Sequence, residues 1–124
     1  MRLTSLLFVP ADSAKKFDKA RGCGADGLIL DLEDSVAPAN KAAARETLKG
    51  WIEGSAGTRD WSFWVRVNPL DTGLTADDLK AVVRPGLDGI ILNEPLYDGS
   101  FMYAEAVAAG ADRFDMFFWG PPQP

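Results

Sequence analysis

The sequence predicts an α/β fold built on a parallel β-sheet, and three observations indicate this class. Strand-like and helix-like segments alternate along the 124 residues, with a period of roughly 25 to 35 residues that matches a βα unit. The apolar run 27–30 lacks the polar alternation of a half-exposed strand, as expected for a strand covered on both faces. No hairpin turn joins successive strands. The sheet is therefore either the first half of an eight-stranded barrel, which needs about 250 residues when complete, or a small doubly wound sheet.

Four strands are predicted as apolar runs between turn residues, at residues 5–9, 27–32, 62–67 and 89–92. In the third strand, Trp64 and Arg66 share one face, because side chains alternate along a strand. An arginine in the middle of a buried strand is costly unless it meets an anion. Arg66 is therefore a candidate site residue.

Three helices follow the first three strands, and each is expected to begin at a polar cap. Asp12 or Ser13 caps the first helix, which ends near Arg21 before two glycines. Asn40 caps the second helix, which runs from residue 41 to about residue 52. Thr75 caps the third helix, whose first turn carries two aspartates in the position that the helix dipole favours.

The composition is that of a globular protein with a real core, because 47% of the residues are hydrophobic and 25% are charged. A net charge of −5 without a basic run argues against nucleic acid, and no apolar stretch approaches the about 20 residues of a membrane span. The single cysteine, Cys23, is expected to be buried and favours a reducing cytoplasm. Because histidine is absent, acid–base chemistry falls to carboxylates and metal binding to oxygen ligands.

Asp31, Glu33 and Asp34 place three carboxylates at the end of the second strand, where parallel-sheet enzymes carry their chemistry. These charges repel one another unless a cation, a basic substrate group or backbone donors offset them, so a divalent metal is one interpretation. A second interpretation is that Asp31 and Asp34 cap the following turn while Glu33 faces solvent. A structural ion pair between Arg66 and Asp31 or Glu33 is also open.

Four segments also carry a family resemblance: SLLFVPADSAKKFDKA, GADGLILDLEDSVAPANKAAAR, WVRVNPLDTGLTADDL and PGLDGIIL. In this order and spacing they resemble the amino-terminal half of the citrate lyase beta subunit family, in the HpcH/HpaI aldolase superfamily of acyl-CoA carbon–carbon lyases. The resemblance implies a partial TIM-type (β/α)8 barrel of about four βα units over residues 1–92. A divergent tail follows at 93–124, with a short helix expected at 103–109 and a strand at 114–119.

The resemblance implies a magnesium-dependent lyase that cleaves a citryl-CoA- or malyl-CoA-like 3-hydroxyacyl thioester to a keto acid and an acetyl thioester. Arg66 matches the family arginine that reaches the substrate carboxylate and the carbonyl oxygen. Asp31, Glu33 and Asp34 match an acidic cluster that organises metal-bound water and the arginine more than it binds the metal.

Phe8 and Lys19 stand where malyl-CoA lyase relatives contact the acyl-CoA, although a solvated surface lysine is the alternative for Lys19. Ser13 replaces a basic residue of some relatives, so a carrier-protein thioester or a free acid stays open. After Leu92 the relatives continue with Pro-Lys-x-Glu, whose glutamate binds magnesium, and they supply an aspartate ligand later. Glu94 is near this position but not aligned with it, so the metal ligands stay unassigned.

Two function classes follow. The first is an active lyase whose metal site is completed in a homo-oligomer or by lyase-complex subunits. The second is a catalytically inactive truncated fragment, or a binding or regulatory module of the same family. An unrelated doubly wound protein is a third interpretation, but no Gly-rich phosphate loop follows any strand. The expected partners are a small-molecule acyl-CoA or keto acid in the cytoplasm, with no nucleic acid and no membrane.

Overall fold

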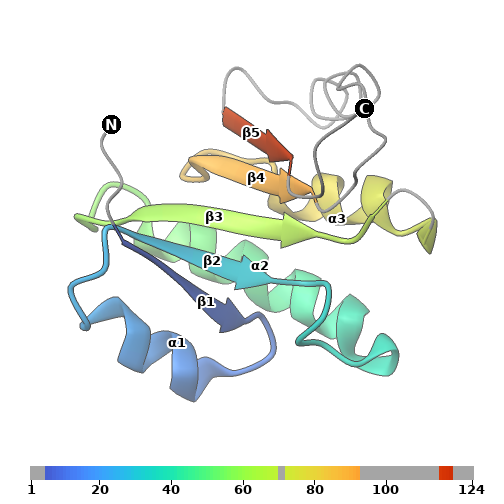
Figure 1. Ribbon diagram of the computed structural model, residues 1–124, viewed down its shortest axis with the longest axis horizontal. Helices are drawn as coiled ribbons and strands as arrows, with labels where there is room; N and C mark the ends of the chain where they lie inside the picture. Colours follow the sequence, from blue (N-terminus) through green and yellow to red (C-terminus); the bar gives the residue numbers. More distant parts are fainter. Residues whose placement is uncertain (1–4, 70–71, 93–114, 119–124) are drawn as a thin grey trace, which may run out of the picture.

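A five-stranded parallel sheet forms the centre of the computed structural model, which describes residues 5–69, 72–92 and 115–118 (Figure 1). Its strands are β1 (Leu6–Pro10), β2 (Gly27–Asp31), β3 (Ser62–Val67), β4 (Gly89–Leu92) and β5 (Asp115–Phe118). The connecting helices are α1 (Ala14–Arg21), α2 (Lys41–Ser55) and α3 (Thr75–Val82), with a short 3-10 helix, η1 (Pro38–Asn40), before α2. Each strand pairs in parallel with its neighbour in the chain, so the sheet order is β1-β2-β3-β4-β5.

This sequential order decides between the two sheets that the sequence allowed. A doubly wound sheet reverses its strand order and carries helices on both faces, whereas a barrel adds each strand beside the last one. The described strands follow the second pattern, and α1, α2 and α3 line one side of the sheet (Figure 1). The predicted α/β fold with a partial barrel is confirmed, and the doubly wound alternative is wrong.

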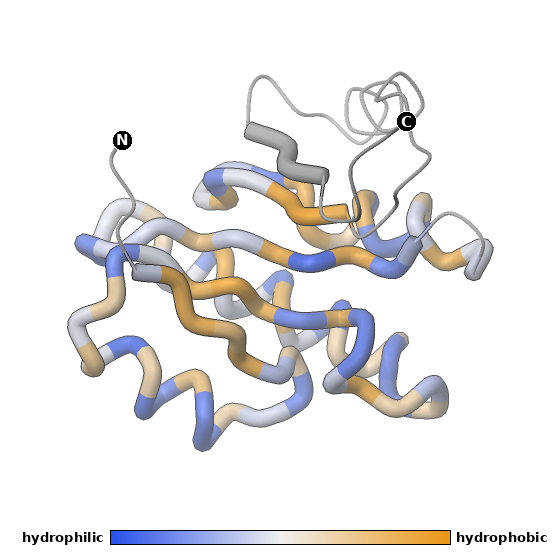
Figure 2. Tube along the Cα trace, viewed as in Figure 1, coloured by the Kyte–Doolittle hydropathy of each residue, from blue (hydrophilic) through white to orange (hydrophobic). Residues whose placement is uncertain are grey.

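The main hydrophobic core fills the space between the sheet and the helices. Strand residues whose side chains point toward the helices, such as Leu30, Phe63 and Ile90, are completely buried in this core. Leu48 and Ile52 of α2 belong to the same core. Figure 2 shows the apolar stretches concentrated in β1, β2 and β4, whereas α1 is mostly polar. The predicted alternation in β3 is confirmed, because Phe63, Val65 and Val67 belong to this core, whereas Trp64 lies on the opposite face.

The opposite face of the sheet holds a smaller apolar cluster of Ile29, Trp64 and Ile91. Ile29 and Trp64 are register partners on β2 and β3, each two residues before the polar pair Asp31 and Arg66, and Ile91 on β4 is the register partner of Arg66. A small apolar floor under polar side chains is the arrangement expected inside a βα barrel. This face therefore carries the candidate site.

The helix starts show where local reasoning succeeded and where it failed. Of the two predicted caps of α1, Asp12 and Ser13, the structure uses Ser13, whose hydroxyl accepts a hydrogen bond from the Lys16 backbone N–H at 3.3 Å. Asn40 precedes α2 but makes no capping hydrogen bond with its side chain, because the chain already turns helically through η1. Thr75 is inside α3 rather than before it, and its hydroxyl donates to the Asn68 carbonyl at 2.7 Å.

Other expectations about the surface and the tail have mixed outcomes. Cys23 is exposed, not buried, because it follows the end of α1 in a surface turn. The strand expected at 114–119 is present as β5, the helix expected at 103–109 is outside the described residues, and a division of the chain at residue 92 stays a prediction. Within the described ranges, no helix combines the length and apolar character needed to cross a bilayer.

Candidate functional site

An ion pair joins β2 and β3 at their carboxyl ends. Asp31 and Arg66 are register partners on these neighbouring parallel strands, so their side chains project from the same face. Arg66 donates from Nε to Asp31 Oδ1 at 2.9 Å and from Nη2 to Oδ2 at 2.6 Å. This two-point geometry is the strongest contact between a guanidinium and a carboxylate. The Asp31 side chain is completely buried, whereas 15% of the Arg66 side chain is exposed.

The Asp31 carboxylate also organises the loop that follows β2. Its Oδ1 accepts the Glu33 backbone N–H at 2.8 Å, and its Oδ2 accepts the Ser35 N–H at 3.2 Å and the Ser35 hydroxyl at 2.7 Å. For Asp31, two interpretations from the sequence therefore hold together, because it both caps the turn and pairs with Arg66, whereas capping by Asp34 stays a prediction. Every oxygen of Asp31 is engaged by donors.

Both members of the pair stay charged. Burial alone would raise the pKa of Asp31, but the hydrogen bonds from Arg66, Ser35 and the Glu33 backbone, with the charge of Arg66, outweigh it and hold that pKa below its ordinary value. The hydrogen bond to Asp31 raises the pKa of Arg66, against the opposing effect of burial. The site thus presents a permanently charged guanidinium held in one orientation.

The other two acids converge on the same guanidinium from farther away. Glu33 Oε1 lies 3.9 Å from Arg66 Nη1, and Asp34 Oδ2 lies 4.0 Å from Nη2. The Glu33 side chain is only 12% exposed, so the expectation that it faces solvent is wrong, whereas Asp34 is 84% exposed. The structure therefore brings all four predicted catalytic residues into one cluster.

This cluster does not by itself form a magnesium site. Among residues 5–69, 72–92 and 115–118, no three acidic, histidine or cysteine side chains lie close enough to hold a metal ion. A direct bond from magnesium to Asp31 would displace Arg66 or the loop donors. Arg66, the Ser35 hydroxyl and backbone N–H groups offset the charge of Asp31.

Phe8 borders the cluster, and Lys19 lies farther out. The Arg66 guanidinium carbon is 4.8 Å from the centre of the Phe8 ring, a cation–π distance, and 45% of Phe8 is exposed. Phe8 and Lys19 both line a hollow of about 300 Å³ along β1 and α1. Its other lining residues are Leu7, Val9, Pro10, Lys16, Ala20 and Cys23. The structure thus connects Phe8 directly to Arg66, and it connects Lys19 to the site only through this hollow.

A polar network behind the acidic loop was not predicted from the sequence. The Lys41 ammonium donates to the Leu32 carbonyl, the Glu33 carbonyl and Asn68 Oδ1, at 2.7, 2.8 and 2.7 Å. The sequence signal was present, since Lys41 begins a helix where the dipole disfavours a positive charge. What that charge contacts depends on residues distant in the chain.

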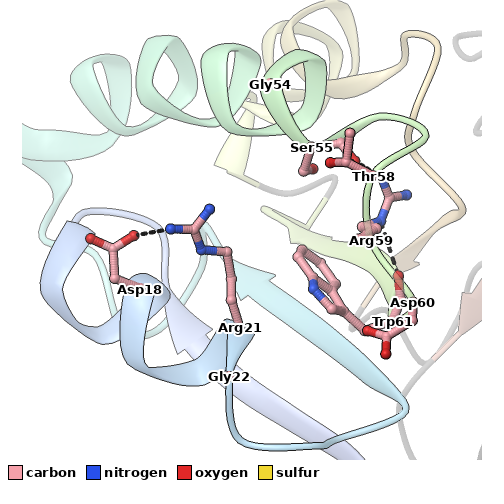
Figure 3. Close-up of a pocket in the computed structure, with 9 residues that line it drawn as sticks. All are labelled: Asp18, Arg21, Gly22, Gly54, Ser55, Thr58, Arg59, Asp60 and Trp61. Carbon is pink, nitrogen blue, oxygen red and sulfur yellow. Dashed lines mark hydrogen bonds and ion pairs between the residues drawn. The ribbon is translucent and has the colours of Figure 1, made fainter.

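A second hollow lies at the amino ends of the strands, and charged and polar side chains contribute most of its lining (Figure 3). It measures about 380 Å³ and lies between the ends of α1 and α2, with Asp18, Arg21 and Trp61 among its walls. Arg59 is held there by four acceptors: the carbonyls of Trp61, Ser55 and Gly86, and the Asp88 carboxylate. In βα barrels, the amino ends of the strands serve stability and the carboxyl ends carry chemistry.

The fold and the oriented arginine define a site of the βα-barrel class, at the carboxyl ends of parallel strands. The chain matches the family described as HpcH/HpaI aldolase/citrate lyase over residues 4–109, and it belongs to this family. The resemblance found in the sequence is therefore confirmed.

Three known proteins illustrate the relationship. The chain is 38% identical over 91 residues to a (3S)-malyl-CoA thioesterase of Cereibacter sphaeroides, covering 71% of this chain and 30% of that protein. It is 41% identical over 88 residues to citrate lyase subunit beta of Escherichia coli, covering 71% and 29%. The structure of CitE from Mycobacterium tuberculosis in complex with magnesium, acetoacetate and coenzyme A aligns with a TM-score of 0.61 and 32% identity, covering 91% and 38%. The match thus spans about a third of the length of these relatives.

Proposed function

We propose that this chain supplies the amino-terminal part of the site of a magnesium-dependent carbon–carbon lyase. Its substrate would be a citryl-CoA- or malyl-CoA-like 3-hydroxyacyl thioester, cleaved to a keto acid and an acetyl thioester. One observation carries the proposal: Asp31 holds Arg66 by Nε and Nη2, while Nη1 makes no hydrogen bond within the described part of the chain. A charged donor is thus left available at the carboxyl edge of the sheet.

Arg66 would bind the carboxylate of the keto-acid portion. Its guanidinium offers planar donors that match a carboxylate, and Asp31 fixes the orientation before the substrate arrives. Glu33 and Asp34 would repel an anion that approached from the wrong side, since both carry negative charge next to the guanidinium. Phe8 would cover one face of the guanidinium and present an apolar contact to the acyl part.

Magnesium, when bound, would supply Lewis-acid polarisation of the carbonyl oxygen. The described residues do not provide its complete ligand set, so further ligands would have to come from outside them. The proposal draws support from the relatives, because the CitE structure contains magnesium, acetoacetate and coenzyme A. Association with further copies or with other lyase subunits, in the cytoplasm, belongs to the same proposal.

A second candidate is a module that binds the acyl thioester or keto acid without cleaving it. The observation that favours it is the full engagement of Asp31 by Arg66, Glu33 and Ser35, which leaves recognition intact but gives no oxygen to a metal. Such a module would need only Arg66 and the surface around Phe8. It could therefore bind ligands without magnesium.

The test is isothermal titration of the full chain, first characterised for size and folding, with oxaloacetate or glyoxylate. Titrations are made with magnesium or with a chelator, and with or without acetyl-CoA. Binding that requires magnesium supports the lyase, and a cleavage assay with malyl-CoA and citryl-CoA follows. Binding that is equal in chelator supports the binding module. No binding by a folded protein contradicts both.

A further inference from the structure

Lys41, the first residue of α2, lies directly behind the acidic loop at the carboxyl ends of the strands. Its ammonium has three protons and three acceptors at 2.7–2.8 Å. Two acceptors are the carbonyls of Leu32 and Glu33, in the loop that follows β2. The third is Asn68, two residues beyond Arg66 at the end of β3. One side chain therefore ties the acidic loop to the strand that carries the arginine.

Asn68 is itself fixed on every side. Its backbone N–H and its Nδ2 both donate to Asp78 Oδ2, at 2.8 and 2.7 Å, and its carbonyl accepts the Thr75 hydroxyl. Asp78 is completely buried and also accepts Arg45 Nε at 2.7 Å. The network thus runs from the loop through Lys41 and Asn68 to α3. Because Asn68 and Asp78 are buried and hydrogen-bonded, removing a partner leaves their polar groups unsatisfied.

The position of Lys41 opposes its local preference. A positive charge in the first turn of a helix is unfavourable, because the exposed N–H groups there already carry positive charge. Lys41 occupies that place because three acceptors, two of them in the loop of carboxylates, offset the cost. A residue that served only the helix would be acidic or neutral here.

We propose that Lys41 is a positioning residue for the site. It holds the loop whose backbone donors, on Glu33 and Ser35, hold Asp31, and Asp31 in turn orients Arg66. Leu32 N–H also bonds to the Arg66 carbonyl at 3.0 Å, so the loop and β3 remain in register where Lys41 joins them. The consequence for ligand affinity rests on the function proposed above, whereas the consequence for loop order does not.

The test compares the unaltered 124-residue chain with Lys41→Met and a matched control, Lys49→Met. Lys49 is on the same helix and loses the same charge, but its ion pair is with the exposed Glu46, one turn away on that helix. Amide hydrogen exchange is measured by NMR at Glu33 and Ser35 and at Val65 in the middle of β3. We expect exchange at Glu33 and Ser35 to accelerate at least about tenfold in Lys41→Met relative to Val65, since a lost hydrogen bond changes a local equilibrium by roughly that factor.

The proposal is overturned if the loop amides keep their wild-type rates, or if all three amides accelerate equally, which is a purely structural loss. If Lys41→Met does not fold, Lys41→Gln, which retains two donors, is measured in the same way and judged by the same criterion. Titration with oxaloacetate then gives an expected drop in affinity of about tenfold for Lys41→Met and none for Lys49→Met. If the wild type binds no oxaloacetate, the proposed function fails, and the exchange rates still decide the role of Lys41.

Discussion

Arg59 and Arg66 stand at opposite ends of β3 and are used differently. Arg59, at the amino end, donates to three carbonyls and to the Asp88 carboxylate, so all three of its nitrogens are committed to the protein. Arg66, at the carboxyl end, is committed to Asp31 through two nitrogens, and its Nη1 has only the 3.9 Å approach to Glu33 among the described residues.

The comparison shows that burial alone does not distinguish a structural arginine from one that can bind a ligand. Both side chains are largely buried and both pair with a carboxylate at hydrogen-bond distance. An arginine with every nitrogen engaged fastens segments of the fold, whereas one that is oriented and has a nitrogen to spare can bind an anion. The count of engaged donors, not the depth of the residue, separates the two roles.

The largest expected effect is that of Asp31→Asn on stability. The substitution removes the hydrogen-bonded counter-charge of the buried Arg66 guanidinium and leaves only the more distant Glu33 and Asp34, so the free energy of unfolding should fall by about 3 kcal/mol. Urea denaturation measures it. The control is Asp18→Asn, which removes the exposed partner of Arg21 and should cost under about 0.5 kcal/mol. Equal losses in the two variants would refute the buried-pair argument.

Arg59→Met should lower the free energy of unfolding by about 2 kcal/mol, because it strips donors from the Asp88 carboxylate and from carbonyls near the second hollow. Affinity for oxaloacetate should not change, since this end of the strands is remote from Arg66. The measurement pairs urea denaturation with calorimetric titration. A stable variant with weakened binding would reverse the assignment of the two arginines.

Arg66→Lys should weaken oxaloacetate binding about tenfold and lower the free energy of unfolding by only about 1 kcal/mol. A lysine keeps the charge opposite Asp31 but cannot present the planar pair of donors. Titration of the folded variant checks the affinity, and Arg59→Lys serves as the matched control. Unchanged affinity and turnover in Arg66→Lys would remove its assigned role.

The smallest expected effect is the loss of stability at acidic pH when Asp31 becomes protonated. Because the folded-state pKa of Asp31 is lowered from its ordinary 3.8, its contribution to stability is fully present above that value and is lost as the pH falls through the folded-state pKa. Wild-type stability should therefore drop more steeply than that of Asp31→Asn below about pH 4. Denaturation curves at a series of pH values test this, and parallel curves would show that another group titrates.

Much of the fold was accessible from the sequence because its signals are local. The apolar runs and their spacing predicted β2, β3 and β4 within one residue at each end. Thr75 was mistaken for a cap because threonine has the chemistry of one, but its hydroxyl is directed to Asn68, seven positions earlier, across the loop between β3 and α3. A nonlocal contact therefore overrode a correct local preference.

The candidate site also has residues that the sequence predicts and one that it does not. Asp31 and Arg66 were recognisable as possible partners because parallel strands bring their carboxyl ends to one edge, so register alone places them side by side. The link from Lys41 to Asn68 spans 27 positions and depends on how α2 seats against the end of β3. No periodicity or motif in one sequence encodes that distance, so Lys41 became visible only in the structure.

The sequential strand order also has a consequence for how the chain assembles. Leu6 pairs with Gly27, 21 positions later, and Gly27 pairs with Ser62, 35 positions later, while Trp64 reaches Gly89 after 25. The entropy of closing a loop grows only with the logarithm of its length, so these closures differ by about 0.5 kcal/mol. Each new strand therefore has nearly the same entropic cost of loop closure, and it pairs with the edge of the strand that precedes it in the chain. The fold can grow in the direction of synthesis, one unit at a time.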